Sequence, residues 1–312
     1  MSILVDESTR VVVQGIGSQG TFHAKRNLDY GTKVVAGIHP KKGGQTWEEL
    51  GVPVYGAVAD AVDAEGVNTS MVMVPAPFAK DAVLEAVDAG IGTIVVITEG
   101  VPAHDMAVIY NTVYPRQPFD PTASAAPSFQ KAGRPVLIGP NCPGVISPGK
   151  ANVGIIPAQI TEPGNVGLVS RSGTLTYQIM HELNEAGVGI STCVGIGGDP
   201  IVGSDFLDVI LRFAEDPETE AIVFVGEIGG TEEQRVGRWI ADNIPDTPVV
   251  AYVAGFTAPP GKQMGHAGAI VREGGGGGET AADKQQALEA LGIAVGVDPT
   301  DTARKMIEAL GR

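Results

Sequence analysis

Hydrophobic runs of strand length alternate along the chain with segments whose apolar residues recur at helical spacing. In the first half the runs predict strands at residues 10–17, 33–40, 70–77, 93–100 and 134–141. In the second half they predict strands at 166–170, 190–197, 221–228 and 248–255. The runs are apolar throughout instead of alternating, which is typical of strands buried on both faces. The pattern therefore predicts an α/β protein with parallel sheets covered by helices on both sides.

Helical periodicity fills many of the intervals between these strands. It predicts helices at 79–90, 175–187, 206–216, 231–243, 281–292 and 300–311. Gly90 is expected to end the first helix. The spacing of Thr231 and Gln234 predicts a capping box at the start of the fourth. The Pro- and Ser-rich stretch 113–133 is interpreted as an exposed loop, and the five glycines at 274–278 as a flexible one.

Composition narrows the class of protein. A chain of 312 residues corresponds to about two domains, and dense Pro and Gly place their boundary near 140–165. The net charge of −15 and the pI of about 4.7 oppose binding to nucleic acids and to anionic membranes. No targeting segment and no run of about 18 apolar residues is recognised. Cys142 and Cys193 have no metal-binding spacing. We expect a soluble cytoplasmic protein with buried thiols and no metal of its own.

A glycine-rich turn begins within the last residues of the first apolar run. Residues 15–20 read G-x-G-x-x-G, a pattern whose backbone amides can hold a pyrophosphate at a helix N-terminus. An NAD-binding unit would place an acidic residue after the second strand, but this chain has Lys41 and Lys42 there. Two lysines favour a phosphorylated ribose, as in CoA or NADP, although solvated lysines are the ordinary alternative. We expect Gly17 to contact this cofactor, and Pro75, after a later strand, to form part of the wall.

A second group of polar residues is expected at the carboxyl ends of the later strands. His266 lies between glycines in QMGHAG, so a large partner can approach its ring. Glu227, in GEIGG, can accept the proton on Nδ1 and leave Nε2 as a nucleophile. Ser172, in SRSGT, is expected to cap a helix whose free amides at Gly173 and Thr174 form an anion site. If they meet at one edge of a sheet, these residues predict phosphoryl transfer through a phosphohistidine.

Each of these features also has an ordinary structural explanation. His266 can be a satisfied structural histidine, Glu227 a surface acid and the capped helix an unremarkable one. Two functional alternatives remain as well. An NADP-dependent oxidoreductase would use the glycine turn and the lysines but would leave the histidine motif unexplained. A non-catalytic CoA-binding subunit would keep the fold and would lose no function when His266 is replaced.

The motifs together resemble those of the α subunits of succinyl-CoA synthetase, also called succinate–CoA ligase. The resemblance runs from residue 1 to the C-terminal helices. The blocks that carry it are GSQGTFH, PKKGG, VPAPF, ITEG, IGPNCPGVISPG, GLVSRSGTLTY, CVGIGGDPI, GEIGG, PVVAYVAGFTAPPGK and MGHAGAIV. It implies a Rossmann-like CoA-binding domain at 1–140, followed by a flavodoxin-like ligase domain at 141–312.

The resemblance also implies roles for individual residues. His266 matches the phosphorylated histidine, Glu227 the acid hydrogen-bonded to it, and Tyr177 a substrate-contacting tyrosine. The helix that begins at SRSGT is implied to stabilise the phosphohistidine together with a second helix from a β subunit. The residues that match CoA contacts are Ser18, Gln19, Lys42, Ile97, Thr98 and Glu99.

The implied partner is a β subunit of the ATP-grasp type, which holds Mg²⁺ and the nucleotide, ATP or GTP. The implied reaction belongs to the tricarboxylic acid cycle and converts succinyl-CoA, phosphate and NDP reversibly to succinate, CoA and NTP. Its intermediates are succinyl phosphate and phosphohistidine. A related acid such as malate, itaconate or citrate is the alternative substrate. The chain departs from the family in its first glycine turn, which is one residue shorter than the usual G-x-T-G-x-x-G and lacks the threonine.

Overall fold

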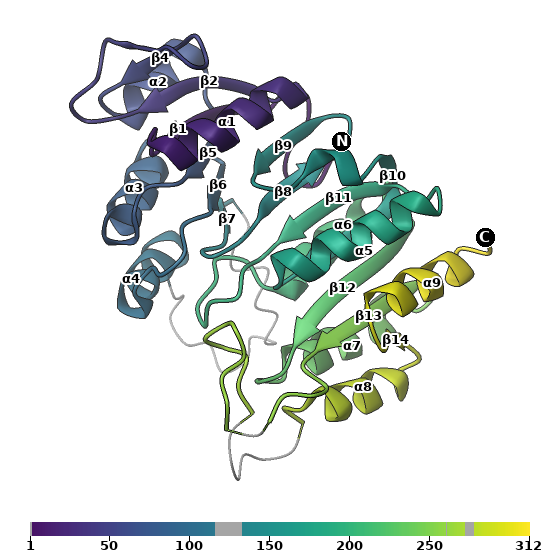
Figure 1. The fold of residues 1–312 in the computed structure, drawn as a ribbon. Coiled ribbons are helices and arrows are strands. Elements are labelled where there is room, and N and C mark those ends of the chain that lie inside the picture. Colours follow the sequence, from purple (N-terminus) through teal and green to yellow (C-terminus); the bar gives the residue numbers. More distant parts are fainter. Residues whose placement is uncertain (1, 116–132, 260, 272–277) are drawn as a thin grey trace.

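The computed structural model describes residues 2–115, 133–259, 261–271 and 278–312. These residues form two seven-stranded sheets, one from each half of the chain (Figure 1). The predicted loop at 113–133 lies mostly outside the described residues, and only Gly278 of the predicted glycine loop is described.

The first sheet is built from the following strands: β1 (Arg10–Gln14), β2 (Lys33–Ile38), β3 (Thr46–Trp47), β4 (Val52–Tyr55), β5 (Thr69–Val72), β6 (Thr93–Val96) and β7 (Val136–Ile138). Their order is β3-β4-β2-β1-β5-β6-β7, and all neighbours are parallel except β3 and β4. Without the short strand β3 this is the strand order of the dinucleotide-binding fold. Its switch point, where strands are added in opposite directions, lies between β1 and β5.

The second sheet contains the strands β8 (Gly144–Ser147), β9 (Ala151–Gly154), β10 (Pro163–Ser170), β11 (Ile190–Gly195), β12 (Ala221–Glu227), β13 (Val249–Ala254) and β14 (Ala294–Gly296). Their order is β14-β13-β12-β10-β11-β8-β9, with β8 antiparallel to both of its neighbours. The five parallel strands follow the flavodoxin order, with the switch point between β10 and β12. The predicted pair of α/β folds is therefore confirmed.

The helices pack in layers on these sheets (Figure 1). Those of the first half are α1 (Ser18–Tyr30), α2 (Val58–Glu65), α3 (Ala76–Asp88) and α4 (Ala103–Val113). Those of the second half are α5 (Gly173–Glu185), α6 (Phe206–Glu215), α7 (Glu232–Asn243), α8 (Ala281–Glu289) and α9 (Pro299–Ala309), with a 3₁₀ turn, η2 (Ala158–Ile160). Helix α5 packs against α9, whereas α7 packs against both α6 and α8. Among the described helices, none has both the length and the hydrophobicity needed to cross a membrane.

The two halves share a continuous apolar core. One cluster of buried residues includes Val11 and Val13 of β1 together with Val145 of β8 and Val153 of β9. Helix α1 lies between them, and the buried Asn27 side chain donates to the main-chain oxygen of Gly154 at 3.1 Å. Buried polar atoms that are bonded in this way cost little, so the contact orients the first half against the second.

The predicted strands are all present, but the hairpin of β8 and β9 and the short strands β3, β4 and β14 were not predicted. These strands have two to four residues each and, in β8 and β9, glycine and polar side chains, so they carry no clear period. Helix α3 begins three residues earlier than expected, because Pro75 and Pro77 are compatible with a helix N-terminus. Gly90 follows this helix with a φ of 78°, as expected of a terminating glycine.

The predicted capping box at α7 is wrong. Thr231 occupies the N-cap position, but its side chain accepts no capping hydrogen bond. The Gln234 side chain instead donates to the main-chain oxygen of Gly278 at 2.5 Å. The Gln234 side chain, which the local pattern predicted to bond at the helix N-terminus, therefore forms a tertiary hydrogen bond instead.

We expect the core of the second half to be sensitive to cavities. Phe213 on α6 is 1% exposed and packs on Gly167 of β10, where an added Cβ would lie 2.8 Å from the ring. Replacing Phe213 by Ala should lower the free energy of unfolding by about 3–5 kcal/mol in urea titrations. The control Phe22→Ala, at a ring 55% exposed, should cost less than about 1 kcal/mol. Equal losses in the two variants would contradict the assignment of Phe213 to the core.

Candidate active site

A short hydrogen bond joins the histidine and the acid that the sequence singled out. Nδ1 of His266 lies 2.6 Å from Oε2 of Glu227, and their side chains are 25% and 10% exposed. Glu227 is the last residue of β12, and His266 lies in the loop after β13, at the same end of the second sheet (Figure 1). An ionised carboxylate only accepts, so Nδ1 donates, and Nε2 keeps its lone pair in the neutral ring.

The surroundings of His266 set its protonation. The hydrogen bond to Glu227 raises the pKa of His266 above its ordinary value of 6.5. Desolvation and the charge of Arg171 act in the opposite direction, and the charge of Asp199 adds to the effect of Glu227. The acid therefore fixes the orientation of the ring and also stabilises any positive charge that forms on it.

The imidazole rests directly on a glycine that the sequence analysis did not assign. A Cβ added to Gly198 would lie 2.2 Å from Cγ of His266, so any side chain there would displace the ring. The loop that carries Gly198 is tied down by Asn141, which donates to Oδ1 of Asp199 at 3.0 Å. Asn141 has a φ of 53°, in the left-handed region that asparagine tolerates. The GIGGDP motif was the available signal, but spacing alone does not show which glycine faces the ring.

A partly buried cation lies beside the pair. Arg171 follows β10, is 12% exposed, and forms an ion pair with Glu232 at 2.5 Å. It helps to line a cavity of about 240 Å³, together with Glu227, Gly229 and Glu233. This cavity lies at the switch point of the second sheet, where a ligand is expected in an open α/β fold. Arg171 lies in the SRSGT motif, and no role was predicted for it from the sequence.

Helix α5 begins at the same switch point. Ser172 is its N-cap, as predicted, and its Oγ accepts from the Leu175 amide at 3.4 Å. The first amides of a helix have no partner within it, which leaves those of Gly173 and Thr174 available to an anion. Tyr177 lies one turn further along; its hydroxyl is near Gly173, and burial raises its pKa. Its hydroxyl therefore stays protonated and can donate.

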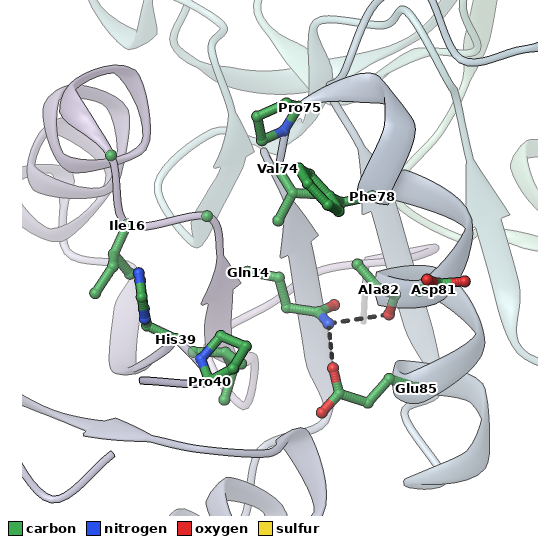
Figure 2. A pocket seen from close by; sticks show the side chains of 13 residues that line it. Gln14, Ile16, His39, Pro40, Val74, Pro75, Phe78, Asp81, Ala82 and Glu85 are labelled. Carbon is green, nitrogen blue, oxygen red and sulfur yellow. Dashed lines mark hydrogen bonds between the residues drawn. The ribbon is translucent and has the colours of Figure 1, made fainter. Parts of the chain in front are cut away.

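The glycine turn of the first half forms one side of a larger cavity, shown in Figure 2. We call it the glycine-turn cavity; it has a volume of about 720 Å³ and lies at the switch point between β1 and β5. The side chain of Gln14 donates to the Ala82 oxygen at 2.9 Å and to Glu85 at 3.2 Å (Figure 2). The residues that line the glycine-turn cavity are Gln14, Gly15, Ile16, Gly17, Ile38, His39, Pro40, Val74, Pro75, Phe78, Asp81, Ala82 and Glu85.

Two glycines of the turn are required by close approaches. Gly15 has a φ of 113°, and a Cβ there would lie 2.6 Å from the Met73 main chain. A Cβ on Gly20 would lie 1.8 Å from the oxygen of Gly15, so only glycine lets α1 start this close to β1. The turn thus keeps the packing of a phosphate-binding turn, although it is one residue shorter than expected.

Only some of the predicted cofactor contacts line this cavity. Gly17 and Pro75 do, and Ser18 and Gln19 follow Gly17 as the first residues of α1. Ser18 and Gln19 are not among the lining residues, and neither are the other predicted contacts, Lys42, Ile97, Thr98 and Glu99. The lining residues that sequence reasoning missed include Gln14, His39 and Phe78. They carry no glycine or charge pattern that could have marked them.

A chain of hydrogen bonds connects the glycine-turn cavity to the histidine. Oγ1 of Thr98 donates to the oxygen of Val74, which lines the cavity, at 2.7 Å. The oxygen of Thr98 accepts from the Asn141 amide at 3.0 Å, and the oxygen of Asn141 accepts from the Gly198 amide at 3.3 Å. Thr98 therefore connects the first cavity, through its side chain, to the main-chain hydrogen bonds that lead to the residue under His266.

The cysteine between these loops is not a nucleophile. Both cysteines are free and buried, as the sequence predicted. The Cys142 thiol donates to the Val96 oxygen at 3.2 Å, and burial raises its pKa to about 12. It stays a protonated packing group at neutral pH.

Comparison with known proteins gives matches over nearly the whole chain. A CoA binding domain family matches residues 6–100, and a CoA-ligase family matches residues 169–294. The chain is 55% identical over 311 residues to succinate–CoA ligase [ADP-forming] subunit alpha 2 of Archaeoglobus fulgidus, covering 99% of this chain and 100% of that one. It is 49% identical to the alpha subunit of Aquifex aeolicus succinate–CoA ligase [ADP-forming], with 99% and 96% covered. It is 47% identical to the malate–CoA ligase alpha subunit of Methylorubrum extorquens, with 100% and 99% covered.

Solved structures share the arrangement of both halves. An ATP citrate lyase of Methanosaeta concilii, in complex with (3S)-citryl-CoA, matches with a TM-score of 0.81 and 26% identity. The match covers 99% of this chain, which spans 50% of the lyase chain. These comparisons give no support to the NADP-dependent oxidoreductase alternative.

We expect Glu227→Gln to lower the pKa of His266, because the charged acceptor is lost while desolvation and Arg171 remain. A titration of the ring by NMR would measure the change. Because folding raises the pKa of His266, its hydrogen bond to Glu227 contributes its full stabilisation of the fold below pH 6.5. This contribution is lost as the pH rises through the pKa that His266 has in the folded state. An unchanged titration midpoint in the variant would contradict the assigned hydrogen bond.

Proposed function

The chain belongs to the family of succinate–CoA ligase α subunits, and from this premise we propose that His266 carries the phosphoryl group of the reaction on Nε2. The observation that carries the proposal is the bond between Nδ1 and Glu227. It leaves Nε2 as the free nucleophile of a ring that only glycine at position 198 can accommodate. The enzyme class is an acid–thiol ligase.

The anion site is proposed to hold the phosphoryl group before and after transfer. The amides of Gly173 and Thr174 point from the N-terminus of α5, where the helix dipole favours negative charge. Ser172 fixes this end of the helix. Arg171 adds a partly buried positive charge near Glu227. In a chain with a net charge of −15, these local groups oppose the repulsion of an anionic substrate.

We propose that CoA occupies the glycine-turn cavity, with residues 1–140 as the CoA domain and 141–312 as the ligase domain. Gly17, Ser18 and Gln19 would hold the pyrophosphate at the start of α1. The cavity volume of about 720 Å³ suits part of a ligand of this size. The thiol arm would follow Ile97, Thr98 and Glu99 towards the histidine, along the main-chain path described above.

The chemistry of this chain is then a relay of one phosphoryl group. Phosphate attacks the thioester carbonyl carbon, the C–S bond breaks, and succinyl phosphate and the CoA thiolate form. Nε2 of His266 attacks the phosphorus, and the succinate oxygen leaves with the electrons of the P–O bond. Glu227 stabilises the imidazolium that this step creates. The phosphohistidine then donates the group to a nucleoside diphosphate.

The last step requires a second protein. An α subunit implies a partner subunit, and we propose the β subunit of the ATP-grasp type, which holds Mg²⁺ and ADP or GDP. We propose the cytoplasm as the compartment, since both cysteines are free thiols. Tyr177, at the start of α5, is the proposed contact to the acid. Because a malate–CoA ligase subunit is 47% identical, malate is the second candidate acid.

The direct test is the intact mass of this chain, co-purified with its β subunit, after exposure to ATP or GTP with Mg²⁺. We expect the gain of one acid-labile phosphoryl group and its discharge by succinate with CoA, and by malate only if that is the substrate. His266→Asn should gain no group and should bind CoA with unchanged affinity. A phosphorylated His266→Asn variant would place the group on another residue. An unmodified wild-type chain with an active partner would support the non-catalytic alternative.

Lys42 provides a test of the CoA orientation. It lies in the turn after β2, and its side chain is exposed. If it contacts the phosphate on the ribose, Lys42→Ala should weaken CoA binding about tenfold, which is about 1.4 kcal/mol. Dephospho-CoA, which lacks this phosphate, should bind the variant and the wild type equally in calorimetric titrations. Equal weakening for both ligands would place the ribose phosphate elsewhere.

A further inference from the structure

A buried ion pair lies directly behind the acid that orients His266. Lys284, on α8, and Glu233, on α7, bond to each other with side chains 0% and 2% exposed. Neither residue is among the hydrogen-bond partners or charges found to act on His266, and the steps proposed above give them no part. Burying two charges costs free energy that the attraction between them does not always recover, so such a pair is weak evidence of a purely stabilising role.

The pair binds the main chain of Glu227 at both of its polar groups. Nζ of Lys284 donates to the oxygen of Glu227 at 2.7 Å and to the oxygen of Gly229 at 2.7 Å. Oε1 of Glu233 accepts from the amide of Glu227 at 3.1 Å. All three ammonium protons thus have acceptors, and both ends of the Glu227 residue are held by charged groups.

Glycines make room for this arrangement. A Cβ on Gly226 would lie 2.4 Å from Oε1 of Glu233, and so would displace the carboxylate from the strand end. A Cβ on Gly237 would lie 2.5 Å from the Leu288 side chain, so glycine lets α7 and α8 approach closely. The helices are therefore close enough for the two side chains to meet under the strand.

The chain after Glu227 depends on contacts with other segments, since the amides of Ile228 and Gly229 donate to the oxygens of Ala254 and Glu279. Gly229 and Gly230 have φ values of 90° and 59°, a conformation that glycine adopts without strain but does not enforce. A carboxylate at such a strand end needs an external support to keep a 2.6 Å contact with a ring on another loop. Lys284 and Glu233 supply that support through their hydrogen bonds to the main chain of Glu227 and Gly229.

We propose that Lys284 and Glu233 are positioning residues that fix the main chain of Glu227, and thereby the hydrogen bond from Glu227 to His266. The inference rests on the function proposed for His266. It predicts that the pair controls the state of the histidine, and not only the stability of the fold.

The test replaces both charges at nearly constant volume in the full chain. Lys284→Met combined with Glu233→Gln leaves no unpaired buried charge, so the double variant is expected to fold. The matched control is Lys305→Met: Lys305 also donates to a main-chain oxygen, that of Val295, and pairs with Asp301, but on α9. Gly226→Ala is the second variant, because it moves the Glu233 carboxylate and keeps both charges.

Two readouts separate positioning from simple stability. The first is the pKa of His266, measured by NMR. The charged neighbours of His266 are Glu227, Arg171 and Asp199. We expect this pKa to fall in the double variant and in Gly226→Ala, and to stay unchanged in the control. The second is the rate of His266 phosphorylation in the complex with the β subunit. We expect it to fall about 10- to 100-fold, the loss typical of a misplaced reacting group, while CoA affinity is retained.

A folded double variant or Gly226→Ala variant with a wild-type pKa of His266 and a wild-type phosphorylation rate would overturn the inference. If the double variant does not fold, Gly226→Ala gives the same decision. The NMR readout needs no phosphoryl transfer. A wild-type chain that is never phosphorylated would therefore count against the proposed function, whereas an unchanged pKa in the variants would count against the positioning role.

Discussion

The hydrogen bond between Glu227 and His266 is the contact on which the site depends. It assigns the two ring nitrogens different tasks, since Nδ1 is used by the carboxylate and Nε2 is free. Its geometry requires a strand that ends at Glu227, a loop that brings the imidazole back to that end, and Gly198 under the ring. Its strength depends on the acid being held still. The buried pair of Lys284 and Glu233 holds Glu227 in place by hydrogen bonds to its main-chain oxygen and amide.

The two sheets bring two switch points into one molecule. One lies between β1 and β5 beside the glycine-turn cavity, and the other lies between β10 and β12 beside Arg171. The path from Thr98 through Asn141 to Gly198 joins them by main-chain hydrogen bonds. In the proposed arrangement, the phosphate-rich end of CoA lies at the first of these strand edges and its thiol reaches towards the second. Arg171 is a local positive charge at the second switch point of an acidic chain.

The sequence predicted the features that follow from local pattern. Long apolar strands, the N-cap at Ser172 and the G-x-G-x-x-G turn are encoded within a few residues, and the pairing of His266 with Glu227 followed from their glycine-rich context at strand ends. Features that depend on distant partners were missed. Gly198, Arg171 and Lys284 acquire their contacts only when separate loops and helices meet. Gln234 shows the same limit, since a tertiary acceptor took its side chain from the predicted capping box.

The most direct measurement is ³¹P NMR of the phosphorylated complex, which distinguishes phosphate on Nε2 from phosphate on Nδ1. Because Nδ1 is bonded to Glu227, we predict a single phosphohistidine resonance of the Nε2 isomer, absent from His266→Asn. Phosphate on Nδ1, or on another residue, would contradict the claim that Glu227 orients His266 for transfer.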